Sequence, residues 1–302
     1  MQQENNNIIP QQPGRNIEWL HCDVGTGSAV HLGHFYSPYP DRDSMYEDPD
    51  FYEKCLSTNM PGIDLRESEQ LEFLKTFSLH DSKPDWSIEP HEAFRYYYKN
   101  YSFEFYDVAC LKAVLSRYRP KKIVEVGSGY STAALFDIKD ACRYEYDIVC
   151  IEPYPQRLEN LLRPEDIPNF TLHKDNLQDI SLDLFKKLSP NDIAFFDCSH
   201  VVKFGSDVNY MFSQILPVLP AGVIVHIHDI FYPFEYPKHW IYDEKRAWNE
   251  AYILRAFLTG NSDWEIIFWA DWVTSCKRDI HAKYHPLSAK HHSGSIWLRK
   301  VK

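Results

Sequence analysis

One short stretch constrains this chain more than any other. Residues 122–132 read KIVEVGSGYST, a β-branched apolar run followed by two glycines and then by residues that suit a helix. Glycine tolerates positive φ and carries no Cβ, so the backbone of such a turn can approach a ligand closely. The helix that follows would present free backbone N–H groups at its start. The stretch therefore predicts a first strand that ends in a tight turn over a ligand.

From this point onward, short apolar runs alternate with amphipathic segments. Strands are expected at 122–126, 146–151, 170–173, 193–196, 223–227, 264–269 and 295–298. Helices are expected at 65–77, 105–119, 131–141, 157–162, 183–188, 206–219 and 246–258. Residues 270–294 show no convincing helix, which indicates an antiparallel pair formed by the last two strands. Repeated βα units predict an α/β fold with a doubly wound, mostly parallel, seven-stranded Rossmann-like sheet.

Composition divides the chain further and excludes some partners. Residues 1–15 are polar and are expected to be a disordered tail, whereas residues 16–104 are expected to form an arm with helices that covers the site. The net charge of −11 argues against nucleic acid as the main partner. No apolar run is long enough to predict a membrane-spanning helix. Seven cysteines without CxxC spacing favour reduced thiols and a cytoplasmic location.

Acidic residues stand at or near the ends of the first five expected strands. Ligands bind beyond the carboxyl ends of the strands in open α/β sheets. The acidic residues at these ends are Glu125, Glu152, Asp175 (followed by Asn176), Asp197 and Asp229. Glu125 would repel a phosphate and suits a cationic ligand, and Glu152 can accept both hydroxyls of a ribose. Gly127 and Gly129 match only the start of the dinucleotide fingerprint, because no glycine stands three residues further on.

This constellation resembles the class I S-adenosylmethionine-dependent methyltransferases over residues 105–302. The resemblance is carried by VEVGSG at 124–129, Glu152, the Asp175–Asn176 pair, FFD at 195–197 and LPVLPAG at 216–222. It implies an S-adenosylmethionine-binding domain with the cofactor residues Glu125, Gly127, Ser128, Gly129, Ser131, Glu152, Asp175, Asn176 and Asp197. Glu125 would lie near the amino group of the cofactor, Glu152 would hold its ribose, and Asp175 or Asn176 would lie by its adenine.

Two further motifs, DCSH at 197–200 and HIHD at 226–229, follow the fourth and fifth strands. They resemble the metal-dependent O-methyltransferases of the catechol and macrolide-sugar types. The resemblance implies a divalent metal at Asp197, His228 and Asp229. His228 stands where that subgroup usually has a carboxylate, and an imidazole admits Mn²⁺, Fe²⁺ or Zn²⁺ beside Mg²⁺.

Two mechanisms fit these residues, with His200, His228 and Asp229 as the catalytic candidates. In one, a metal lowers the pKa of an acceptor hydroxyl, which attacks the sulfonium methyl group. In the other, His200 or His228 is a general base that Asp229 or Asp197 orients.

The expected reaction is O-methylation of a small molecule, for example a sugar of a surface glycan or natural product. N-methylation on the same fold, a metal-dependent hydrolase or oxygenase, and a non-catalytic cofactor-binding module are alternatives. A homo-oligomer is left open.

Overall fold

The computed structural model of the chain describes residues 30–77, 84–285 and 293–302. Contacts divide the chain into two compact units, residues 1–55 and residues 56–302. In the first unit, the described part contains α1 (Arg42–Glu47) and α2 (Phe51–Cys55). The expected tail at 1–15 lies outside the described residues. Residues 56–104 belong to the same unit as the sheet, and the covering of the site by an arm stays a prediction.

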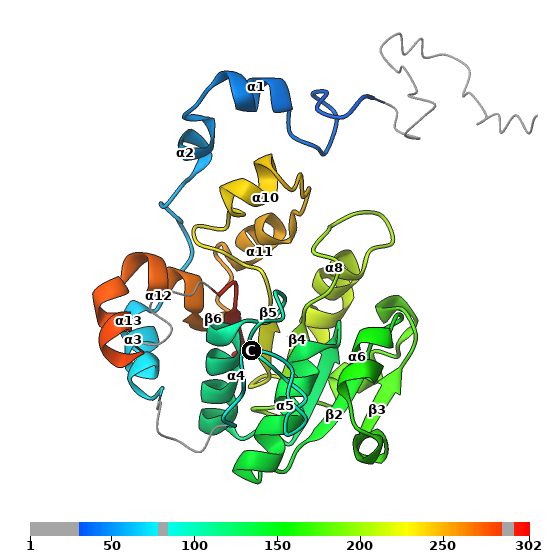
Figure 1. The fold of residues 1–302 in the computed structure, drawn as a ribbon. Helices are drawn as coiled ribbons and strands as arrows, with labels where there is room; N and C mark the ends of the chain where they lie inside the picture. The colour runs from blue at the N-terminus through cyan, green and yellow to red at the C-terminus, as the bar shows by residue number, and fades with distance from the viewer. Residues whose placement is uncertain (1–29, 78–83, 286–292) are drawn as a thin grey trace, which may run out of the picture. The chain divides into compact units, whose positions relative to one another are not determined.

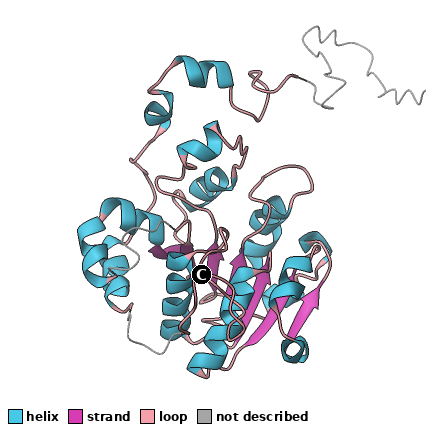
Figure 2. Cartoon of the chain, in the orientation of Figure 1, coloured by secondary structure: helices cyan, strands magenta, loops and turns pink. Residues whose placement is uncertain are grey.

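The second unit is built on one sheet of seven strands, drawn in magenta in Figure 2. The strands are β1 (Lys122–Val126), β2 (Asp147–Ile151), β3 (Phe170–His173), β4 (Ile193–Phe196), β5 (Ile224–Ile227), β6 (Trp264–Trp269) and β7 (Ile296–Lys300). Their order is β3-β2-β1-β4-β5-β7-β6. The first five pair in parallel, and β7 runs antiparallel to both β5 and β6. The predicted doubly wound sheet with an antiparallel edge is confirmed.

Helices flank this sheet, and α4 and α5 lie in front of it in Figure 1. The longer ones are α3 (Glu67–Lys75), α4 (Phe105–Tyr118), α5 (Tyr130–Cys142), α6 (Gln156–Leu161), α11 (Glu250–Leu258), α12 (Ala270–Cys276) and α13 (Arg278–Tyr284). The shorter ones are α7 (Asp183–Lys186), α8 (Asp207–Tyr210), which continues through a π-helical turn at Met211–Ile215 into α9 (Leu216–Val218), and α10 (Lys238–Tyr242). No helix in the described part of the chain is long and apolar enough to cross a bilayer.

Two sequence-based expectations about helices were wrong. The helix expected from residue 246 begins only at Glu250, because Arg246 stacks on Trp240 and the side chain of Asn249 bonds to the backbone of Val202. The segment without an expected helix contains α12 and α13. These two helices are too short to show a sustained period, and α13 faces the core through His281, which a hydropathy pattern counts as polar.

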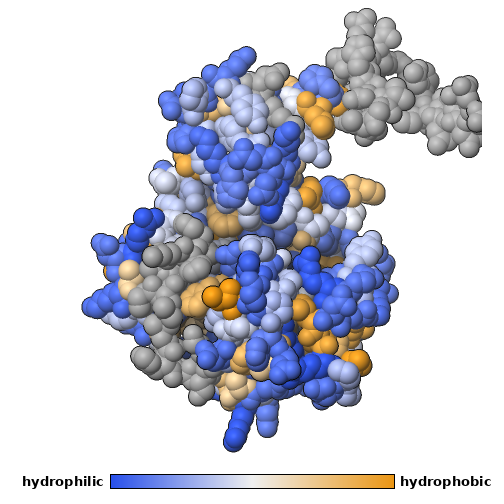
Figure 3. Space-filling view, in the orientation of Figure 1, coloured by the Kyte–Doolittle hydropathy of each residue, from blue (hydrophilic) through white to orange (hydrophobic). Residues whose placement is uncertain are grey.

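Burial of the strands explains why their sequences are continuous apolar runs. Every residue of β4 and β5 is buried, as expected for parallel strands covered on both faces. The face of the molecule in Figure 3 is mostly hydrophilic, with hydrophobic atoms in small scattered groups. Among the described residues, the largest fully buried side chains are apolar or aromatic and include Trp269, Trp272 and Trp297.

A buried ionic network fixes residues 84–104 to the sheet unit. The Arg95 guanidinium donates to Asp137 at 3.0 Å, to Asp140 at 2.8 Å and to Asp166 at 2.5 Å and 2.6 Å. The Trp86 indole donates to the same Asp137 at 2.8 Å. Because Asp137 lies on α5, this network holds the segment that leads into α4 in a fixed place.

We expect Arg95→Ala to lower the free energy of unfolding by about 3–5 kcal/mol, since it leaves buried carboxylates without their counter-charge. Urea denaturation measures this loss. Lys99→Ala is the matched control, because it removes an exposed pair with Glu89 and should leave the midpoint unchanged. Equal midpoints for both variants would contradict the assignment.

Candidate functional site

The turn after β1 touches the end of β4 so closely that no side chain fits between them. Gly127 has φ +82°, and a Cβ on it would lie 1.6 Å from the carbonyl oxygen of Asp197. The Gly127 N–H donates to Ile151 at the end of β2, and the Asp197 N–H donates to Val126. The ends of β1, β2 and β4 therefore meet at one point, as the sequence predicted for ligand-binding strand ends.

Glu125 lies wholly buried beneath this turn. The Thr132 hydroxyl donates to its Oε2, and the Cys150 thiol lies 3.6 Å from the same oxygen. Its other oxygen, Oε1, has no hydrogen-bond partner among the described residues. Burial raises the pKa of Glu125 to about 7. A ligand that donates a hydrogen bond, or that carries positive charge, would satisfy this oxygen.

Glu152 follows β2 and accepts two backbone hydrogen bonds. The Ser128 N–H donates to Oε2 at 3.2 Å, and the Tyr154 N–H donates to Oε1 at 2.8 Å. Each carboxylate oxygen keeps a further lone pair, and the side chain is only half-buried. The buried Ser128 hydroxyl beside it has no partner in the described part of the chain. Ser128 and Glu152 thus form a second polar surface next to the glycine turn.

The remaining predicted cofactor residues are more dispersed. Gly129 precedes α5, and Ser131 is buried in the first turn of that helix. Asp175 and Asn176 are exposed beyond β3, where Asn176 donates to Asp179 at 3.3 Å.

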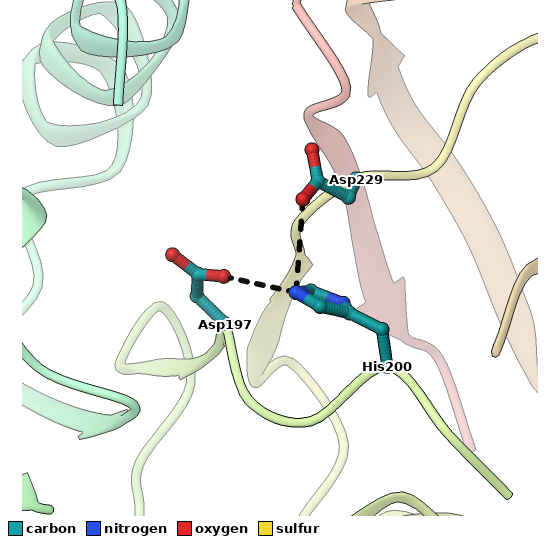
Figure 4. Close-up of side chains that lie close together, drawn as sticks. All are labelled: Asp197, His200 and Asp229. Atoms are coloured by element: carbon teal, nitrogen blue, oxygen red, sulfur yellow. Dashed lines mark ion pairs between the residues drawn. The ribbon is translucent and has the colours of Figure 1, made fainter. Parts of the chain in front are cut away.

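Asp197, His200 and Asp229 come together beyond the ends of β4 and β5 (Figure 4). His200 Nε2 lies 3.3 Å from Asp197 Oδ1 and 3.6 Å from Asp229 Oδ2. One ligand atom from each of the three side chains lies within 4.8 Å of the others. Two carboxylates and one imidazole at this spacing are able to hold a divalent cation.

Two of these three residues adopt left-handed backbone conformations, with φ of 59° at His200 and 57° at Asp229. Such conformations are costly for residues other than glycine, and they gather at functional sites. Gly294 supports Asp229, because a Cβ at Gly294 would lie 2.6 Å from the Asp229 Cα, and its carbonyl accepts the Ile230 N–H at 2.7 Å. The close approach of Gly294, two residues before β7 begins, thus sets the position of Asp229.

His228 lies beside this group without joining it. Its Nε2 lies 3.3 Å from the Ser102 carbonyl oxygen and 3.8 Å from Asp229 Oδ1. The geometry favours His200 over His228 as the nitrogen ligand of a cation, and the metal role of His228 stays a prediction. His226 stacks on Phe195 at 3.9 Å, and burial keeps its pKa well below the usual range, as in a neutral core imidazole.

The charges of the group favour a cation at its centre. Burial would lower the pKa of His200, but hydrogen bonds to Asp197 and Glu250 and the charge of Asp229 raise it well above its usual value. Burial would raise the pKa of Asp197, but the imidazoles of His228 and His200 hold it below its usual value. Either a proton on Nε2 of His200 or a divalent ion beside Nε2 would supply the positive charge that these carboxylates favour. The two cannot be present together, because both use the lone pair of Nε2.

Glu250 is a site residue that sequence reasoning missed. Its Oε2 lies 2.8 Å from His200 Nδ1, and its side chain is 1% exposed. Glu250 is the first residue of α11 and does not follow a strand, so it is not among the residues expected at the strand ends. The only signal in the sequence was an acidic residue among the apolar residues of an expected helix.

Residues 124–230 match a family model described as a methyltransferase domain. An uncharacterized protein of Archaeoglobus fulgidus is 32% identical over 178 residues, which are 57% of this chain and 79% of that protein.

Solved structures are less similar. An apo structure of CmcI-N160 is 18% identical with a TM-score of 0.43, covering 74% of this chain and 88% of that one. The O-methyltransferase TomG of Streptomyces achromogenes, in complex with S-adenosylmethionine, is 14% identical with a TM-score of 0.42, covering 87% and 99%.

We expect Gly127→Ala to destabilise the protein far more than Gly205→Ala does. Both glycines have positive φ, so each alanine costs about 1–2 kcal/mol through its backbone conformation. Only at Gly127 does a Cβ overlap a backbone carbonyl, and there the loss should exceed about 4 kcal/mol, a value that few point mutations reach. Urea denaturation of both variants measures the loss of unfolding free energy. Equal losses in the two variants would show that the turn can move away from Asp197.

Proposed function

The chain belongs to the class I S-adenosylmethionine-dependent methyltransferase family, and we propose that it methylates a hydroxyl group of a small molecule. The observation that carries this proposal is the convergence of Asp197, His200 and Asp229 beyond β4 and β5. The turn at Gly127 touches Asp197 itself. The cofactor surface and the cation-binding side chains are therefore parts of one site.

The residues beside the glycine turn fit S-adenosylmethionine. When bound, this cofactor supplies an electrophilic methyl group on a sulfonium. The Oε1 atom of Glu125, which has no partner among the described residues, can accept a hydrogen bond from the amino group of the cofactor. Burial raises the pKa of Glu125, and a positively charged donor at Oε1 would compensate for that burial. Glu152 offers its free lone pairs to the ribose hydroxyls, and the Ser128 hydroxyl lies beside it. Asp175 or Asn176 would contact the adenine.

The donor set at Asp197, His200 and Asp229 fits a divalent cation. When bound, such an ion supplies a Lewis acid that lowers the pKa of a hydroxyl. Asp197 and Asp229 neutralise the charge of the ion, and His200 adds a nitrogen ligand that admits Mn²⁺, Fe²⁺ or Zn²⁺ beside Mg²⁺. His200 thereby takes the place that the sequence pattern gave to His228.

The same side chains favour a hydroxyl over an amine as the acceptor. A neutral amine is already nucleophilic, whereas a hydroxyl must lose its proton to attack. Carboxylates that attract positive charge beside the acceptor are suited to removing the proton of a hydroxyl group. Positioning and deprotonation are the main tasks left to the protein, because the sulfonium carries a good leaving group.

Aromatic side chains next to His200 suit a ring-shaped acceptor, such as a sugar. Trp248 lies over the His200 ring, with the ring centroids 4.3 Å apart, and Trp240 packs against Trp248 at 5.3 Å. Both indoles are half-buried, so part of each can face an acceptor. In contrast, Phe234 and Tyr236, which lie between β5 and α10, are buried and pack in the core.

We expect Glu152→Ala to weaken S-adenosylmethionine binding by about 1–3 kcal/mol, as for lost hydrogen bonds to a charged group. Isothermal calorimetry measures the affinity. Glu159→Ala is the control, because Glu159 forms an exposed pair with Lys174 and should not affect binding. No binding to the unaltered protein would refute the cofactor, and equal affinities of the two variants would refute the ribose contact.

We expect Asp229→Ala to abolish Mn²⁺ binding while S-adenosylmethionine binding is nearly retained, because Asp229 belongs to the cation group alone. Calorimetry with each ligand measures both. His200→Ala should weaken Mn²⁺ binding more than His228→Ala does. The reverse order would restore His228 as the ligand. If the unaltered protein binds no Mn²⁺, and EDTA leaves turnover intact, a histidine base replaces the cation.

A further inference from the structure

We propose that Glu250 is a positioning residue, which turns the Nε2 atom of His200 toward Asp197 and Asp229 and so decides which cations the site prefers. This inference rests on the cation site of the proposed function. It concerns a residue outside the three ligands, on an element that follows the site by twenty residues of sequence. His200 has two ring nitrogens, and only one of them can face the carboxylate pair of Asp197 and Asp229.

The Nδ1 atom of His200 is engaged by Glu250. Glu250 Oε2 lies 2.8 Å from Nδ1, and the side chain of Glu250 is 1% exposed. A carboxylate accepts hydrogen bonds and donates none, so it selects the ring form with a proton on Nδ1. The lone pair is then left on Nε2, the atom that lies 3.3 Å from Asp197 and 3.6 Å from Asp229. Metal-binding histidines are oriented by carboxylates in this manner.

The backbone of His200 is held by the same end of α11. The His200 carbonyl accepts the N–H of Asn249 at 3.1 Å and the N–H of Glu250 at 3.2 Å. These donors belong to the start of a helix, where backbone N–H groups lack partners within the helix. The contacts offset part of the cost of the left-handed conformation at His200.

The loop beyond His200 is fixed separately, by the side chain of Asn249. Its Oδ1 accepts the Val202 N–H at 2.5 Å, and its Nδ2 donates to the Val202 carbonyl at 3.3 Å. Asn249 therefore holds the path of the loop without touching the imidazole. This division offers a matched control, because one residue orients the ring and its neighbour orients the backbone.

Burial supports a role for Glu250 beyond packing. Its second oxygen, Oε1, has no hydrogen-bond partner among the described residues. No ion pair joins Glu250 to a lysine or arginine in the part of the chain that the structure describes; its one charged contact there is His200. A buried carboxylate is costly unless it is paired, so a leucine of similar size would pack at least as well. A contact with the imidazole is what the carboxylate provides and leucine does not.

The expected consequence is selective for the metal. An imidazole nitrogen favours Mn²⁺ over Mg²⁺, which prefers oxygen ligands such as the two aspartates. If the ring loses its orientation, Mn²⁺ binding should suffer most, whereas Mg²⁺ binding rests on Asp197 and Asp229. A residue that only stabilised the fold would affect both metals and the cofactor alike.

The test is calorimetry of the full chain with Mn²⁺, Mg²⁺ and S-adenosylmethionine. Removal of such an orienting partner weakens metal binding by about 10–100-fold. We expect this loss of Mn²⁺ affinity in Glu250→Leu. The affinities for Mg²⁺ and for the cofactor should change by less than about threefold, which is smaller than the loss expected for Mn²⁺. Glu250→Gln keeps an acceptor for Nδ1–H and should recover most of the Mn²⁺ affinity. Asn249→Ala should bind Mn²⁺ nearly as the unaltered chain does.

Several results would overturn the inference. They are Mn²⁺ affinity unchanged in Glu250→Leu, a parallel loss of both metals and of the cofactor, or an equal Mn²⁺ loss in Asn249→Ala. If the unaltered chain binds no Mn²⁺, the proposed cation site is refuted, and the proposed role of Glu250 is refuted with it. That failure is seen before any variant is made, so the two proposals fail in different measurements.

Discussion

The contact between the β1 turn and the end of β4 is the constraint on which the site depends. Gly127 approaches the Asp197 carbonyl within a distance that any Cβ would occupy. The parallel pairing of β1 with β4, and of β4 with β5, then brings the residues after each strand to one edge. The proposed cofactor surface at Glu125 and the proposed cation group at Asp197 and Asp229 are neighbours for this reason.

Charge is the second constraint on the site. Asp197, Asp229 and Glu250 surround one imidazole, and carboxylates taken out of water require a compensating positive charge. A proton on His200 or a divalent cation meets that requirement, and the orientation of the ring decides which atoms face the cation. The reaction that we propose uses the same field, because a centre that attracts positive charge also favours the loss of a proton from a hydroxyl.

Much of the sheet could be predicted because buried strands leave a direct signal in the sequence. The runs at 122–126, 170–173, 193–196 and 264–269 coincide with β1, β3, β4 and β6. Helices whose contacts are polar or aromatic were harder to predict. The start of α11 is set by the tie between Asn249 and Val202, and α13 presents a buried His281 to the core. The periodicity of hydropathy does not reveal either contact, because both join residues that lie far apart in the sequence.

The sequence by itself determined the sheet, the glycine turn and the carboxylates at the strand ends, because period and residue type follow from local chemistry. It also placed Asp197 and Asp229 together, since neighbouring parallel strands end at one edge. Only the tertiary structure showed that His200 lies close to both aspartates, which the hydropathy pattern could not indicate, and this favours His200 over His228 as the proposed nitrogen ligand. The choice depends on a left-handed backbone at His200 and on Glu250 arriving from α11. Contacts between residues fifty positions apart, and the direction in which a ring points, are properties of the packed chain.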